Sequence, residues 1–188
     1  DNQCCQQTYI DRYVQTGGKK DLSKVKENLD HQMGTNRVNY WTWIDAIQMA
    51  MPAYAKYAKI TGERKYLDYA MNSYKWSRDT LANGLFNKKE GLWWRDKDYV
   101  PPYKEKDGSN CYWSRGNGWV YAALVRVMET LPKKDKYYQY LKKDFILMSK
   151  AILKCQRKDG YWNVSLVCPA NYGGPEMTGT GLFLYGMA

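Results

Sequence analysis

The chain has 188 residues, which suits one domain with a sizeable core, and 15% of them are aromatic, mainly through 18 Tyr and 8 Trp. Its 29 Lys and Arg exceed its 19 Asp and Glu, but the lysines are scattered and no arginine-rich arm is present, so we expect no nucleic-acid partner. No apolar run could cross a bilayer, and residues 1–20 lack the apolar stretch of a signal peptide, so we expect no membrane partner.

Two short helices are predicted at the N-terminus. Residues 4–14 and 22–33 carry apolar residues at helical spacing on either side of the turn Gly17-Gly18. Asp21 or Ser23 would cap the second helix, since both side chains can accept a hydrogen bond from a free backbone N–H.

An apolar helix and an amphipathic helix come next. The stretch Y-W-T-W-I-D at residues 40–45 leads into a helix that is apolar nearly all round, as expected for an inner element of a layered structure. Thr61-Gly62 ends it. Residues 64–81 then alternate Lys and Arg with apolar positions, which is typical of an outer helix, and Asn83-Gly84 ends that helix.

The second half of the chain follows the same order. Residues 85–111 are irregular, with short strands expected at residues 85–86 and 92–94. A second apolar helix is predicted over residues 117–131, and a second amphipathic helix over residues 136–156.

These similarities form an internal repeat of about seventy residues. E-G-L-W at residues 90–93 resembles D-G-Y-W at residues 159–162, and M-T-G-T-G-L at residues 177–182 begins a third copy. Each copy contains an inner helix, an outer helix and a long aromatic loop.

A longer match sets the register between the first two copies. Y-W-T-W-I-D aligns with Y-W-S-R-G-N at residues 112–117. This alignment predicts that Asp45 lies opposite Asn117 and that Trp43 lies opposite Arg115.

Stacked around an axis, such copies form an all-α fold, an α/α toroid of helical hairpins, as one domain over residues 1–188. The long loops and the N-termini of the inner helices would then open on one face. We expect a cleft on that face to carry Trp41, Trp43, Asp45, Trp93, Trp94, Asp96, Asp98, Trp113, Arg115, Asn117 and Trp119.

The side chains of this predicted cleft favour a sugar ligand. The C–H faces of sugars stack on indoles, while their hydroxyls bond to Asp and Asn. Arg115 lies between Trp113 and Trp119 near an expected helix N-terminus, and a guanidinium in that place indicates an anionic group on the ligand. The residues therefore predict a saccharide that contains a uronic acid.

At these residues the chain resembles the unsaturated glucuronyl and rhamnogalacturonyl hydrolases, most closely glycoside hydrolase family 105, which is related to family 88. The resemblance covers residues 38–188 and implies a barrel of six helical hairpins, of which this chain would form a part that ends just inside a third repeat. It rests on W-x-W-x-D-A with M-A-x-P (residues 41–52), G-L-W-W-x-D-x-D (residues 91–98) and W-x-R-G-N-G-W (residues 113–119).

The resemblance also implies a reaction. An unsaturated uronic acid would be removed from the non-reducing end of oligosaccharides that a polysaccharide lyase has produced, of the pectin or rhamnogalacturonan type. The C4=C5 double bond is hydrated, after which the unstable product opens and releases the neighbouring sugar. One carboxyl group can protonate C4 and then, as carboxylate, take a proton from the water that attacks C5.

Matching the motifs assigns roles to residues. Asp98 would be the acid/base, with Asp96 as the alternative, and burial of Asp98 among neighbouring aromatic rings would raise its pKa. Asp45 would orient sugar hydroxyls, unless it only caps its helix. The implied substrate-binding residues are Trp41, Trp43, Trp94, Trp113, Arg115, Asn117 and Trp119.

No metal or cofactor is expected. The five cysteines form no C-x-x-C pair, and His31 is the only histidine, so the usual spacing of a zinc site is missing. The odd number of cysteines fits no complete disulfide framework.

Other functions remain open from the residues. An inverting endo-glycosidase on the same scaffold would pair Asp45 with Asp96 or Asp98 across a water. A carbohydrate-binding module would keep the aromatic cleft without chemistry. A basic nucleic-acid binder would show an affinity that falls steeply with salt.

Overall fold

The computed structural model describes residues 3–188, apart from the side chains of residues 19–21. Nearly all of its regular structure is helical, and one small antiparallel hairpin pairs Phe86 with Trp93 and Asn87 with Leu92. The elements are α1 (Cys4–Thr16), α2 (Lys19–Met33), α3 (Asp45–Thr61), α4 (Arg64–Asp79), the 3-10 helix η1 (Leu81–Asn83), β1 (Phe86–Asn87), β2 (Leu92–Trp93), α5 (Ser114–Met128), α6 (Lys136–Lys154) and α7 (Met177–Met187).

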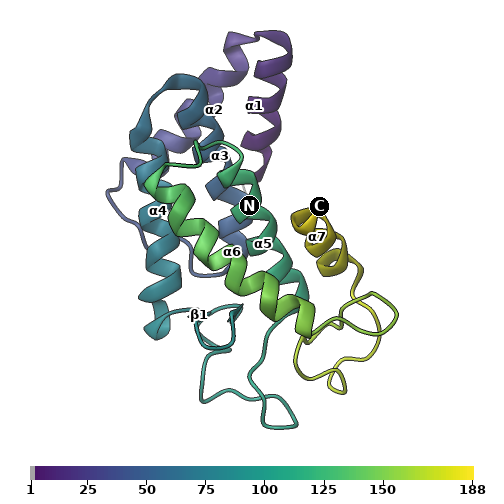
Figure 1. The fold of residues 1–188 in the computed structure, drawn as a ribbon. Helices are drawn as coiled ribbons and strands as arrows, with labels where there is room; N and C mark the ends of the chain where they lie inside the picture. Colours follow the sequence, from purple (N-terminus) through teal and green to yellow (C-terminus); the bar gives the residue numbers. More distant parts are fainter. Residues whose placement is uncertain (1–2) are drawn as a thin grey trace.

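The helices form two layers, as the repeat predicts. Helices α1, α3, α5 and α7 pack side by side in that order, and α2, α4 and α6 each pack on the inner helix that precedes them (Figure 1). This arrangement is an arc of an α/α toroid. Among the described residues, no helix is long and apolar enough to cross a membrane.

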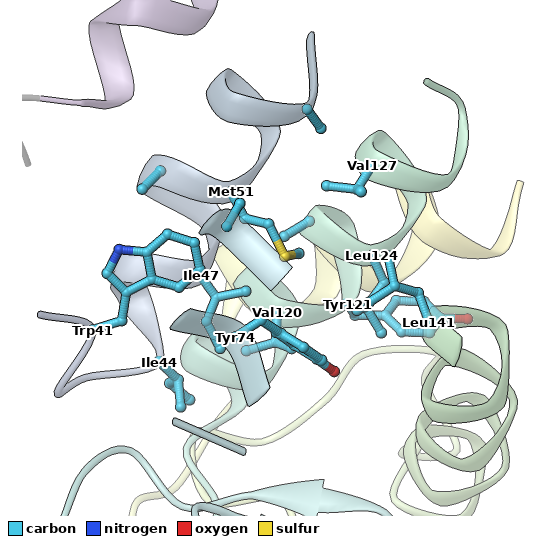
Figure 2. Close-up of a cluster of buried hydrophobic side chains, with 14 of the residues drawn as sticks. Trp41, Ile44, Ile47, Met51, Tyr74, Val120, Tyr121, Leu124, Val127 and Leu141 are labelled. Carbon is cyan, nitrogen blue, oxygen red and sulfur yellow. The ribbon is translucent and has the colours of Figure 1, made fainter. Parts of the chain in front are cut away.

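The core lies between neighbouring inner helices and between the inner and outer layers. Ile47 and Met51 of α3 face Val120 and Leu124 of α5, and all four side chains are buried (Figure 2). Nearly continuous apolar sequence makes α3 and α5 inner helices because each must bury more than one face.

A buried ion pair joins the outer helices α4 and α6. Arg78 donates from Nε and Nη2 to the two carboxylate oxygens of Asp144, at 2.7 and 2.6 Å, and Tyr74 donates its hydroxyl to Asp144 at 2.8 Å. Arg78 also donates from Nη1 to Asp79 at 2.6 Å, but the buried carboxylate of Asp144 depends on Arg78 for compensation of its charge.

Two predicted helix starts are wrong. Helix α2 begins at Lys19, after Gly18, so Ser23 lies within the helix and does not cap it; the side chain of Asp21 lies outside the described part. Helix α5 begins at Ser114, so Arg115 belongs to its first turn and not to the preceding loop.

The two glycines of the R-G-N-G-W stretch lie inside α5, where they permit close packing of neighbours. A Cβ atom on Gly116 would lie 2.8 Å from Ile44 Cδ1, and one on Gly118 would lie 3.0 Å from Leu182 Cβ. The lack of side chains at these two positions therefore lets Ile44, next to α3, and α7 approach α5 closely.

Candidate active site

Two backbone connections organise the end of the molecule where α3 and α5 begin. Ile44 donates its N–H to the carbonyl of Arg95 at 3.0 Å, and Trp43 forms an isolated antiparallel bridge with Asp96. Ser114 donates likewise to Val164 at 2.8 Å, and Trp113 forms a bridge with Ser165.

These connections correct the register of the repeat. The two bridges make Trp43 equivalent to Trp113, so Asp45 is equivalent to Arg115 and not to Asn117. A carboxylate and a guanidinium therefore occupy corresponding positions in the first turns of adjacent inner helices. The predicted alignment was wrong by two residues.

Asp45 is a half-buried carboxyl group at the first position of α3. Its Oδ1 atom is buried and has no hydrogen-bond partner among the described residues. Burial raises the pKa of Asp45, and the negative charge of Asp96 adds to this effect, while Arg95 and Arg115 oppose it. A carboxyl group that holds its proton more firmly than usual, with a free oxygen, is suited to donate that proton.

Arg115 lies against two indoles. Its guanidinium carbon is 4.7 Å from the centre of the Trp113 ring and 6.0 Å from that of Trp119, and the two rings meet nearly edge to face. No carboxylate of the described residues lies within ion-pair distance of Arg115, and its buried Nε has no partner. The indoles thus orient a positive charge that remains available to an anionic ligand.

Asp96 is fully engaged by the protein. It is 2% exposed, and its two oxygens accept hydrogen bonds from Arg95 Nε at 2.7 Å and from the backbone N–H of Asp98 at 2.8 Å. Arg95 in turn lies 4.4 Å from the ring centre of Tyr99. Both partners of this carboxylate lie within residues 95–98, so it stabilises its own loop, which is a structural task.

The predicted environment of Asp98 is wrong. Its side chain is 66% exposed and forms an ion pair with Lys97 at 2.6 Å, so no aromatic rings bury it. Asp98 follows Asp96 by two residues on an irregular loop, and only the inner of the two is covered. The burial among aromatic rings that the sequence predicted for Asp98 is therefore absent.

The predicted aromatic platforms divide into two groups. Trp43 is 57% exposed, and Trp94, Trp113 and Trp119 are partly exposed, so a ligand can reach these rings. Trp41 is completely buried and belongs to the core (Figure 2). Ser77 donates its hydroxyl to the Trp41 carbonyl. As arranged here, Trp41 offers no face to a sugar.

Asn117 is also a structural residue in this arrangement. Its Oδ1 accepts the Trp93 N–H at 2.8 Å, and its Nδ2 donates to the carbonyls of Trp93 and Trp113, both at 3.0 Å. The side chain is completely buried. Asn117 therefore joins β2 to the start of α5 and does not face a cleft.

Arg95 and Tyr99 are site residues that sequence reasoning missed. A small cavity of about 190 Å³ lies next to the Trp113 indole, and Arg95, Tyr99, Tyr103 and Tyr172 are among the residues that line it. Arg95 stands directly between Trp94 and Asp96 in the G-L-W-W-R-D-K-D stretch, so its neighbours were the available signal.

Comparison with known proteins defines the family. The family model described as Glycosyl Hydrolase Family 88 matches residues 1–188. The chain belongs to glycosyl hydrolase family 88. The resemblance to this group of families is thereby confirmed, while the finer assignment to family 105 stays a prediction.

Relatives of this family 88 chain support the fold. A solved glycosyl hydrolase family 88 structure from Bacteroides vulgatus superimposes with a TM-score of 0.92 at 37% identity, over 98% of this chain and 52% of that one. A family 105 structure from C. acetobutylicum ATCC 824 gives a TM-score of 0.77 at 25% identity, over 97% and 54%. The predicted α/α toroid is confirmed.

A curated relative carries a more specific name. An unsaturated 3S-rhamnoglycuronyl hydrolase from Alteromonas sp. (strain LOR) is 38% identical over 152 residues, which are 79% of this chain and 35% of that protein. The family 88 chain thus spans about a third of this curated relative and about half of the solved relatives.

Proposed function

We propose that the protein containing this chain is a glycoside hydrolase that removes an unsaturated uronic acid from the non-reducing end of an oligosaccharide. The observation that carries the proposal is the half-buried carboxyl group of Asp45, with its raised pKa and free oxygen, next to the available guanidinium of Arg115. Family 88 membership supports the same class of reaction.

We assign the acid/base role to Asp45. The protonated carboxyl group donates its proton to C4 of the double bond, and the resulting carboxylate takes a proton from the water whose oxygen bonds to C5. Asp45 ends protonated, as it began, and one water has been added across the bond. The hydrated sugar then opens and releases its neighbour.

Arg115 is proposed to bind the carboxylate of the uronate. A guanidinium can form two parallel hydrogen bonds with a carboxylate, and Trp113 and Trp119 keep it from turning away. Trp43 offers an exposed ring on which a sugar can stack.

The neighbouring sugar is proposed to be rhamnose. The name of the Alteromonas relative refers to a rhamnoglycuronyl substrate, and the sequence resemblance points to rhamnogalacturonan-type oligosaccharides.

Asp96 is unsuited to the paired-carboxylate mechanism of an inverting glycosidase, because both of its oxygens already accept hydrogen bonds within the protein.

The test follows the ultraviolet absorbance of an unsaturated uronyl disaccharide incubated with the full-length protein. Loss of absorbance reports attack on the C4=C5 bond. We expect Asp45→Asn to lower the rate at least about a hundredfold, since it removes the proton donor. Asp98→Asn is the matched control, with the same chemical change at an exposed residue, and should retain most of the rate. A full rate in Asp45→Asn would refute the assignment.

A further inference from the structure

A second concave surface lies outside the candidate active site. It is a groove of about 840 Å³ lined by the β1–β2 hairpin, the C-terminal part of α6 and the loop that follows α6. The hairpin lies near the C-terminal end of α6 in Figure 1. None of its lining residues belongs to the site around Asp45 and Arg115. We call it the α6 groove.

The α6 groove is strongly basic. Six cationic side chains from three separate segments line it, against the single carboxylate of Glu90. They are Lys88 and Lys89 of the hairpin, Lys150 and Lys154 of α6, and Arg157 and Lys158 of the following loop.

Only part of this charge is compensated. Lys88 pairs with Asp79 at 2.9 Å, and Arg157 pairs with Asp159 at 2.7 Å. Among the described side chains, the ammonium groups of the remaining four lysines have no carboxylate partner within 4 Å; these are Lys89, Lys150, Lys154 and Lys158. The helix C-terminus favours Lys150 and Lys154, but it does not account for the loop lysines that face the same groove.

Like charges gathered on a concave surface raise the local potential and attract a polyanion. The lining contains apolar groups from Leu92, Leu147 and Leu166 but no aromatic ring. Proteins that bind single-stranded nucleic acids stack the bases on aromatic side chains, so this groove lacks their usual platform. Lysine clusters without such platforms suit the sulfate or carboxylate groups of a polysaccharide.

We propose that the α6 groove is a second carbohydrate site, which binds anionic polysaccharide through its sulfate or carboxylate groups. This binding function goes beyond the reaction proposed for Asp45, and the α6 groove shares no residue with the candidate active site. A site of this kind would hold the protein on a charged polymer whose cleaved ends are processed elsewhere on the molecule.

The test measures binding of the full-length protein to immobilised dextran sulfate and to polygalacturonate, with uncharged dextran as the reference. The anionic polymer that binds with the higher affinity identifies the preferred group, which is sulfate for dextran sulfate and carboxylate for polygalacturonate. The double variant Lys150→Gln with Lys154→Gln should lower the affinity about tenfold, and raised salt should weaken binding by the parent protein. Asp45→Asn should leave this binding unchanged.

The matched control is the double variant Lys142→Gln with Lys143→Gln, which removes the same charge from exposed positions of α6 outside the groove. It should change the affinity less than twofold. Equal losses in the two double variants would overturn the proposal, because only overall charge would then matter. Tighter binding to single-stranded nucleic acid than to either anionic polymer would overturn it too. Hydrolysis of the disaccharide is measured separately. Failure of the proposed reaction would therefore appear in the absorbance assay, and failure of the proposed groove would appear in the polymer-binding assay.

Discussion

Replacing Asn117 with alanine tests whether this residue holds the structure or binds substrate. In the parent, the Asn117 amide accepts the Trp93 N–H and donates to the Trp93 carbonyl. The Trp94 N–H donates to the Leu85 carbonyl across the antiparallel hairpin. Successive residues of such a strand alternate between facing the partner strand and facing away from it, so the N–H and carbonyl of Trp93 point away from β1. Asn117 is their partner.

The cost of Asn117→Ala follows from these bonds. The Trp93 N–H and carbonyl both lose their partner in a buried place, at about 1–3 kcal/mol each. The Trp113 carbonyl still accepts the backbone N–H of Asn117, so it adds little. We expect a loss of about 4 kcal/mol in the free energy of unfolding. For a chain of this size this corresponds to a fall in Tm of about 10 °C.

The assay is thermal unfolding followed by circular dichroism, together with KM for the unsaturated disaccharide. Ser149→Ala, which removes a partly buried hydroxyl bonded to Tyr121, serves as the control and should lower Tm by only a few degrees. An Asn117→Ala variant with the Tm of the parent and a raised KM would refute this reasoning. That result would return Asn117 to the substrate-binding role that its sequence position predicts.

Three further predictions concern charged residues. The folded protein holds the Asp45 proton more tightly than the unfolded chain does, so the stability that this proton contributes is lost as pH rises through the raised pKa of Asp45. Asp45→Asn should therefore have a higher Tm than the parent at neutral pH. In thermal melts at a series of pH values, this difference in Tm should vanish below about pH 4. Arg115→Met removes a positive charge that lowers the pKa of Asp45, so the alkaline limb of the rate profile should move to higher pH, and KM should rise about tenfold or more through the lost carboxylate contact; an unchanged profile and KM would contradict this. Asp144→Ala removes the acceptor of Arg78 Nε and Nη2 and leaves this buried guanidinium only its bond to Asp79, so it should cost about 3 kcal/mol in chemical denaturation; a loss below about 1 kcal/mol would show that the pair is dispensable.

Much of the architecture follows from the sequence alone. The inner and outer helices differ in how many of their faces are apolar, and this is a local property that the period of the residues records. The repeat of E-G-L-W and D-G-Y-W corresponds to a real equivalence. Gly91 and Gly160 both adopt positive φ, and Trp93 and Trp162 are both completely buried.

The sequence also predicts correctly which segments lie close together. The W-T-W-I-D-A, G-L-W-W-R-D-K-D and W-S-R-G-N-G-W stretches do meet at one end of the inner helices, through the bridge of Trp43 with Asp96 and the hydrogen bonds of Asn117 with Trp93. Inner helices that run in the same direction place their N-termini on one face, so this outcome depends only on the order of the elements.

The tertiary structure decided which side chains face that end. Asp96 and Asp98 are both acidic and only two residues apart, yet one is buried against Arg95 and the other is exposed beside Lys97. Asn117 and Trp41 point inward for the same reason, because residues distant in the sequence cover them. Burial sets the pKa of a carboxyl group, and burial depends on packing between segments. That is why Asp45 could be placed from the sequence, but its protonation could be argued only from the fold.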